Sequence, residues 1–137
     1  MSEENDRDDD RMEITEGIDE IMPMIPLRGL AIFPSMVLHF DIGREKSISA
    51  LEKAMMMNQK VFLSTQMNPD MDLPTRDDFY QVGTIAKIKQ MLRLPGDTIR
   101  VLVEGVSRGK IVDYIFEVPY FKCRVLPIEE EEYDKFP

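Results

Sequence analysis

The sequence has 137 residues, is 43% hydrophobic and carries a net charge of −9, so we expect one domain that buries about two-thirds of its unfolded surface. No apolar run approaches the ~20 residues of a membrane span, and the first residues form neither an apolar signal core nor an arginine-rich transit pattern. A single cysteine, Cys123, excludes an internal disulfide and fits a reducing compartment. We therefore expect a cytoplasmic protein.

The negative charge is concentrated at the two ends of the chain. Residues 1–20 hold ten acids and two arginines, and residues 129–137 hold five acids and one lysine. We predict a disordered acidic tail at 1–19, because too few large apolar groups are present there to offset the entropy of ordering. An acidic lure for a basic partner is the alternative. The domain itself is expected at 20–127, with a charged linker at 128–137.

The first strand is predicted at 20–27. Pro23 and Pro26 lack an N–H, so this strand should lie at a sheet edge or hydrogen-bond through one side only. The apolar loop 30–34 follows, and a second strand is predicted at 36–40. This loop either folds under the sheet as core or forms an exposed patch, and exposed apolar patches tend to bind other molecules.

A helix is predicted at 44–59. Its apolar face repeats at i, i+3, i+4 spacing in Ile48, Leu51, Ala54, Met55 and Asn58. Because Met55, Met56 and Met57 span about 200° of the circumference, at least one should be partly exposed. The helix is either a plain surface helix packed by one face, or its adaptable methionines form a contact surface for varied sequences.

A hairpin is predicted at 78–109 around the turn Leu94-Pro95-Gly96-Asp97, where proline fixes φ and glycine supplies the positive φ of a type II turn. Its ascending limb is irregular, since Ile85 and Met91 share parity with Lys87 and Lys89. Residues 67–77 are predicted to be an irregular loop. Further strands are predicted at 60–66, 110–116 and 120–126, with Pro119 separating the last two. The elements together predict a mainly β (α+β) domain: an antiparallel, strongly bent sheet or open barrel of about six strands with one helix.

The sequence contains no pattern typical of catalysis. A Gly-x-x-x-x-Gly-Lys-Ser/Thr phosphate loop and a dinucleotide fingerprint are missing, and His39 and Cys123 are too few for a zinc site. His39 lies mid-strand, where a packed or solvated histidine is favoured over a general base. Cys123 is predicted to be a small buried hydrophobe, and the Asp77-Asp78 pair to be solvated. We predict no catalytic residue, metal ligand or cofactor.

Nucleic-acid binding is an alternative with limited support. A modest basic stripe could form across the hairpin from Lys87, Lys89, Arg93 and Arg100. Single-stranded nucleic acid also needs stacking aromatics, and none lies between Tyr80 and Tyr114.

Six segments carry a family resemblance. They are Pro23-Met-Ile-Pro-Leu-Arg28, Phe33-Pro34, Gly43-Arg-Glu-Lys-Ser-Ile48, Asp78-Phe-Tyr-Gln-Val-Gly-Thr84, Lys89-Gln-Met-Leu-Arg-Leu-Pro95 and Val101-Leu-Val-Glu-Gly-Val-Ser-Arg108. In order and spacing over 21–126, they resemble the N-terminal domain of the Lon ATP-dependent proteases. The chain departs from that family at Pro95-Gly-Asp97, where Pro-Asp-Gly is frequent, which changes the turn type at most.

The resemblance implies a PUA-like β-fold at the substrate-recognition end of a homohexameric AAA+ protease that degrades misfolded and regulatory proteins. It also implies a helical arm, an ATPase module with ATP and Mg²⁺, and a Ser-Lys peptidase, none of which this sequence contains. We therefore expect an isolated fragment that binds clients but is not itself an enzyme. The implied partners are unfolded or degron-bearing proteins and neighbouring subunits, with no membrane and no nucleic acid.

A receptor for unfolded clients needs accessible apolar surface that tolerates many sequences. The candidates are Phe33, Pro34 and Met36 in the apolar loop, Met91, Leu92, Leu94 and Pro95 at the hairpin tip, and, as a more polar site, Glu45 and Lys46 at the helix start. Two rival functions are a structural module that holds subunits together and a free-standing PUA-like nucleic-acid binder.

Overall fold

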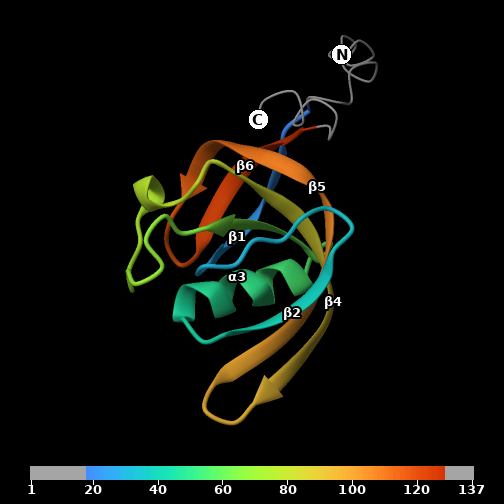
Figure 1. Ribbon diagram of the computed structural model, residues 1–137, viewed down its shortest axis with the longest axis vertical. Coiled ribbons are helices and arrows are strands. Elements are labelled where there is room, and N and C mark those ends of the chain that lie inside the picture. The colour runs from blue at the N-terminus through green and yellow to red at the C-terminus, as the bar shows by residue number, and fades with distance from the viewer. Residues whose placement is uncertain (1–17, 129–137) are drawn as a thin grey trace, which may run out of the picture.

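The computed structural model describes residues 18–128, which form six strands, one α-helix and a 3-10 turn (Figure 1). The strands are β1 (Glu20–Leu27), β2 (Val37–Ile42), β3 (Lys60–Thr65), β4 (Val82–Leu94), β5 (Thr98–Phe116) and β6 (Phe121–Ile128), and helix α3 (Glu45–Met55) lies between β2 and β3. The mainly β fold with one helix is confirmed. The predicted acidic tail and C-terminal linker lie almost entirely outside the described residues.

The sheet closes on itself through β5. Its strand order is β2-β5-β4-β3-β1-β6, and β5 also pairs with β6. The N-terminal half of β5 holds β2, and its C-terminal half holds β6 from Arg108↔Ile128 to Phe116↔Lys122. The predicted bent, barrel-like sheet is therefore present, but its ring of β5, β4, β3, β1 and β6 is closed and not open. The length of β5, 19 residues, makes both pairings possible.

The sheet is mixed, so the prediction of a purely antiparallel sheet is also wrong. β1 and β3 are parallel over Met24↔Phe62 to Leu27↔Thr65. Parallel neighbours need a long crossover, and here it contains β2 and α3. Of the two alternatives predicted for β1, the edge position does not hold, since β1 lies between β3 and β6, whereas pairing through one side holds at both prolines. Its halves nevertheless pair with different neighbours, 20–24 with β6 and 24–27 with β3, so each proline has one paired side.

Two hydrophobic cores lie on opposite faces of β1. Met22 and Met24 join one cluster, whose other members come from β3, β4, β5, β6 and the residue Phe79. Ile25 and Leu27 join the second cluster, which contains the buried face of α3. Burial on both faces explains why β1 is a nearly continuous apolar run rather than an alternating one.

Helix α3 packs on the sheet through Ala50, Leu51 and Ala54. It ends at Met55, earlier than predicted, because the chain turns out through Gln59, which has a φ of +66° and donates its N–H to the Ala54 carbonyl at 2.9 Å. Met56 is exposed, which confirms the predicted exposure within the methionine run. Within residues 18–128, no helix has the length and apolar character needed to cross a membrane.

The hairpin of β4 and β5 closes at Leu94↔Thr98, and Gly96 has the expected positive φ, +85°. Asp97 also has a positive φ, which aspartate tolerates better than most residues. Two register shifts in the ladder, at Ile85/Ala86 and Ile88/Gln90, account for the irregular parity of the ascending limb.

The predicted division between the hairpin and a separate strand at 110–116 is wrong, since β5 continues unbroken from Thr98 to Phe116. The loop at 67–77 is irregular as predicted, except for a 3-10 turn at Arg76–Asp78 that a Thr75–Asp78 capping box closes.

Cys123 is fully buried in the cluster between the strands, as its alternation with Phe121 and Val125 predicted. Its Sγ lies 3.9 Å from the sulfur of Met24. Burial raises the pKa of the thiol to about 12.

Cys123 should therefore be inert in the folded protein. A thiol-reactive dye at pH 8 should label it at least ~100-fold more slowly than in concentrated guanidinium, because both access and the thiolate fraction fall on folding. Absorbance-monitored labelling with a disulfide reagent measures both rates. Equal rates in the two conditions would contradict this burial.

Candidate functional site

The nine candidate residues lie in three separate places. Phe33, Pro34 and Met36 lie over Gly105 in the middle of β5, whereas the hairpin tip is seven residues away along the strand, roughly 23 Å. Glu45 and Lys46 lie at the start of α3. In Figure 1 the hairpin projects beyond α3, away from the loop that precedes β2. The structure thus offers three distinct surfaces instead of one.

The surface at the hairpin tip is a concavity that we name the hairpin hollow. It has a volume of about 600 Å³ and is lined by His39, Met55, Gln90, Met91, Leu92, Arg100 and Leu102. Leu92 is 59% exposed, whereas Met91 packs partly against the core. Leu94 is half-buried and Pro95 is exposed. The ion pair of Arg93 with Glu52, 3.5 Å, joins the hairpin to α3.

The hairpin hollow also contains residues that were not among the candidates. Met55 comes from α3, and His39 and Leu102 come from the adjacent strands β2 and β5. Only the exposure expected in the methionine run pointed to Met55, and no local signal places His39 beside the hairpin. His39 is exposed here, consistent with the solvated histidine that was predicted.

The apolar loop is both core and surface. Ile32 is 3% exposed and belongs to the core beneath α3, whereas Phe33 is 47% exposed. The backbone is fixed on β5 by two hydrogen bonds, in which Ser35 N–H donates to the Gly105 carbonyl and Gly105 N–H donates to the Met36 carbonyl, each at 2.9 Å. Both predicted alternatives for this loop therefore hold in part: Ile32 belongs to the core, and Phe33 is exposed on the surface.

The ring of Phe33 covers a buried cation. The guanidinium of Arg108 lies 4.5 Å from the ring centroid, and Arg108 is only 8% exposed. Arg108 also donates to the Thr84 hydroxyl at 3.5 Å, and that hydroxyl donates to the Ile32 carbonyl. Phe33 thus has a structural contact as well as an exposed face, which the sequence pattern did not indicate.

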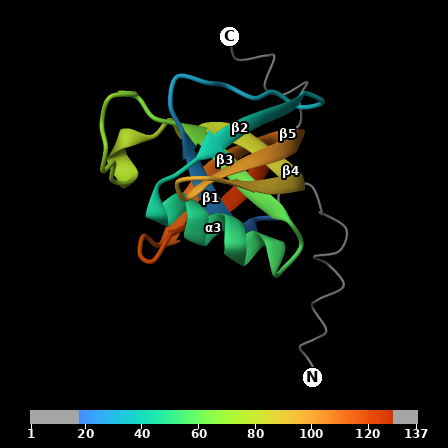
Figure 2. The same cartoon turned by 90° about the horizontal axis from the view of Figure 1, so that it is seen from below.

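The start of α3 borders a second concavity, which we name the helix hollow, of about 660 Å³. Its walls come from α3, the 72–75 loop and the ends of β1, β5 and β6: Pro26, Arg28, Arg44, Glu45, Lys46, Ser47, Asp72, Leu73, Pro74, Thr75, Glu117 and Phe121. Both ribbon views show the loop before β4 standing out on the side where α3 begins (Figures 1 and 2). Leu73 is 86% exposed, and Lys46 Nζ lies 4.4 Å from the ring centroid of Phe121.

Asp78, one of the two acids at the 3-10 turn, has a structural role. Asp78 accepts the backbone N–H of Thr75 at 2.7 Å and its hydroxyl at 3.1 Å. Within residues 18–128, no group of three or more His, Cys, Asp or Glu side chains is placed to hold a metal ion.

The predicted basic stripe is largely neutralised. Arg100 donates to both carboxylate oxygens of Asp41, at 2.8 and 3.1 Å, and this hydrogen bonding lowers the pKa of Asp41. Lys89 lies 3.6 Å from Glu104, and Arg93 pairs with Glu52. Three of the four cations therefore face carboxylates of this chain, which disfavours a phosphate-binding surface.

Fold and surface together define a mainly β domain that exposes apolar side chains from a closed barrel. This chain belongs to the ATP-dependent protease La (LON) substrate-binding domain family, whose model matches residues 21–136. The resemblance inferred from the six segments is thereby confirmed.

Curated relatives carry the name Lon protease. The chain is 55% identical over 113 residues to the protein from Clostridium acetobutylicum and 56% identical over 117 residues to that from Clostridioides difficile, covering 82% and 85% of this chain. It is 47% identical over 119 residues to Lon protease 1 from Bacillus subtilis. The matched regions cover only 14%, 14% and 15% of those three proteins.

Two solved structures share the fold. The N-terminal domain of a Mycobacterium avium complex Lon protease superposes with a TM-score of 0.64 at 20% identity, covering 81% of this chain and 56% of that one. A Lon N-terminal domain protein from Xanthomonas campestris gives 0.62 at 10% identity, covering 80% and 60%.

The seating of the apolar loop can be tested at Gly105. A Cβ at this position would lie 2.3 Å from the Phe33 carbonyl oxygen, so Gly105→Ala must displace the loop. We expect the free energy of unfolding to fall by about 1–3 kcal/mol in urea denaturation.

Gly43→Ala is the matched control. A Cβ there meets nothing closer than the Thr98 hydroxyl at 3.8 Å, so its stability should change by no more than about 0.5 kcal/mol. Equal stability of the two variants would show that the loop does not depend on this close approach.

Proposed function

We propose that this chain recognises clients for a Lon-type ATP-dependent protease, and that its own activity is the binding of unfolded or degron-bearing polypeptide. The observation that supports the proposal best is the hairpin hollow, where Leu92 stands exposed beside Met91, Met55 and Leu102. Exposed apolar groups around a concavity are typical of protein-binding surfaces.

The composition of this hollow suits varied clients. Met55 and Met91 are unbranched and polarizable, so they can repack against different apolar side chains. Single contacts with Leu92 and its neighbours are small, so we expect micromolar affinity. Phe33, Pro34 and Met36 form a second proposed contact surface, and Glu45 and Lys46 a third and more polar one.

The proposal extends to a longer protein. We propose a homohexameric AAA+ protease in the bacterial cytoplasm that removes misfolded and regulatory proteins, with this chain contributing a domain at 20–127. ATP with Mg²⁺ and a Ser-Lys peptidase would reside in other parts of that protein, since the present sequence has no phosphate loop. The names of the longer relatives support this assignment.

Substitution of Leu92 tests the proposal. Leu92→Asp should weaken the binding of a fluorescein-labelled, reduced and carboxymethylated protein at least ~5-fold, because it places a charge in the apolar hollow. Val112→Asp is the matched control, since Val112 is similarly exposed, at 53%, on the far half of β5. Fluorescence anisotropy gives both affinities.

Phe33→Ser is the companion variant for the second surface and should also weaken binding. Because Phe33 covers Arg108, a thermal melt must show that this variant remains folded. If Phe33→Ser unfolds the chain, its weaker binding has no separate cause, and Phe33 is then a structural residue. Absence of client binding by the unmodified chain, together with a concentration-dependent dimer in sedimentation, would favour a subunit-contact module instead.

A further inference from the structure

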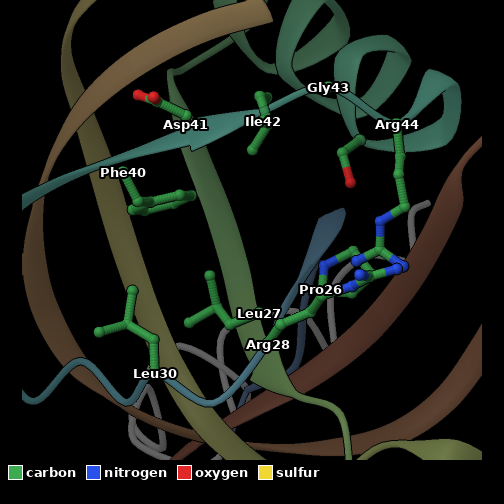
Figure 3. A pocket seen from close by; sticks show the side chains of 10 residues that line it. Pro26, Leu27, Arg28, Leu30, Phe40, Asp41, Ile42, Gly43 and Arg44 are labelled. Carbon is green, nitrogen blue, oxygen red and sulfur yellow. The ribbon is translucent and has the colours of Figure 1, made fainter. Parts of the chain in front are cut away.

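A third concavity adjoins the helix hollow and has a different character. It has a volume of about 330 Å³ and an apolar wall formed by Pro26, Leu27, Leu30, Phe40 and Ile42 (Figure 3). We name it the arginine hollow, because Arg28 and Arg44 stand at its border with the helix hollow. Pro26, Arg28, Arg44 and Ser47 line both concavities.

Arg28 and Arg44 both contact the same residue, Asp72. Figure 3 shows their side chains reaching the same place from the end of β1 and the start of α3. Arg28 donates to the Asp72 carboxylate at 3.0 Å, whereas Arg44 donates to the Asp72 carbonyl at 3.3 Å. Asp41, the other acid of the arginine hollow, already accepts two hydrogen bonds from Arg100.

The electrostatic consequence is that two guanidinium groups lie close together at this border. Burial together with the charge of Arg28 lowers the pKa of Arg44, and Asp72 is the carboxylate that opposes this effect. Glu45 and Glu117 also line the adjoining helix hollow, where Glu117 pairs with Arg76 at 2.6 Å. Arginine stays protonated regardless, so both positive charges persist at neutral pH.

The N-terminal turn of α3 adds hydrogen-bond donors. A helix leaves its first backbone N–H groups without intrahelical partners, and the N-cap residue Arg44 supplies no side-chain cap within the described part of the chain. Ser47, in this turn, is 3% exposed and lines both hollows. The start of α3, the side chain of Ser47 and two guanidinium groups thus line a place where an anion would be stabilised.

The apolar wall selects among anions. A carboxylate held by Arg28, Arg44 and Ser47 would lie at the mouth of an apolar concavity large enough for one side chain. In a polypeptide, only the last residue carries an apolar side chain and a carboxylate on the same Cα. The preceding residues would run into the helix hollow, along Leu73 and Pro74 and past Glu45 and Lys46.

We infer that Arg28, Arg44, Ser47 and the start of α3 bind the free α-carboxylate of a client whose C-terminal residue is apolar, with that side chain in the arginine hollow. This inference rests on the proposed function and specifies one class of client. C-terminal carboxylate capture by backbone N–H groups is an established mode of peptide recognition.

Four fluorescent ten-residue peptides test the inference against the full 137-residue chain. One ends in leucine with a free carboxylate, and the second is its carboxamide. The third ends in glutamate carboxamide, so its only terminal carboxylate is in a side chain, and the fourth ends in glycine with a free carboxylate. We expect the first to bind roughly tenfold or more tightly than each of the others, because only it offers both groups together.

Variants assign the effect to the site. Arg44→Gln and Ser47→Ala should each reduce the preference for free acid over carboxamide, and Arg44→Gln should reduce it more. Lys110→Gln is the control, since it removes one exposed positive charge from β5, away from both hollows. Circular dichroism and thermal melts confirm that each variant is folded.

Three results would overturn the inference. The first is equal binding of free acid and carboxamide, or binding of no peptide. The second is equal binding of the glutamate carboxamide, which would indicate a general carboxylate site. The third is free-acid binding only after deletion of residues 2–17, which would make the chain's own acidic segment the occupant. In each of these cases the proposed function is tested separately. It stands if the unmodified chain still binds unfolded protein and Leu92→Asp abolishes that binding.

Discussion

The pairing of β5 with three other strands is the constraint on which the rest of the fold depends. Its first half holds β2 and β4, and its second half holds β6, so one continuous strand connects the hairpin to the closed ring. The strand pairs with β4 from Thr98 to Lys110 on one side, and with β2 at 99–104 and β6 from Arg108 on the other, which favours continuity despite the glycines within it. Gly105 lies between the two halves, and there the apolar loop reaches the strand closely enough to exchange backbone hydrogen bonds.

The parallel pairing of β1 and β3 has a comparable consequence on the other side of the molecule. It requires a crossover, and the crossover places α3 over one core while its first turn lies beside the end of β1. Arg28 follows β1 and Arg44 precedes α3, so residues sixteen positions apart meet on the same segment, at Asp72. The two hollows therefore follow from the topology and not from any local motif.

The features that were predictable have local causes. The alternation of Ile99, Val101 and Val103, the turn chemistry at Gly96 and the burial of Cys123 are each encoded within a few neighbouring residues. The apolar face of α3 was predicted in part, since Leu51 and Ala54 are buried whereas Asn58 lies beyond the helix and is exposed. Element bounds for β1 and β3 were accurate for the same reason. Three other features depend on strand partners far away in the sequence: the parallel ladder, the closure through β6 and the continuity of β5. The hydrophobic periodicity of one sequence does not reveal such partners.

The candidate residues divide in the same way. Leu92 was identifiable because a leucine next to a hairpin turn has little core to enter, and it is exposed. Arg108 gave no sign that it would lie buried beneath Phe33, and Arg28 and Ser47 gave none that they would line hollows. Each of these depends on a tertiary contact between elements whose relative placement was unknown.

The two proposed surfaces lie at opposite ends of α3. Arg44 and Ser47 lie at the start of α3, and Met55 at its end lines the hairpin hollow, so about 16 Å of helix separates the two surfaces. An extended polypeptide spans this distance with roughly five residues. A client engaged at both surfaces would pay the entropy of association once, so two weak contacts would reinforce each other through effective concentration. Under the proposed function, the adaptable hairpin hollow would contribute affinity for many sequences, whereas the arginine hollow, with its few fixed donors, would contribute discrimination.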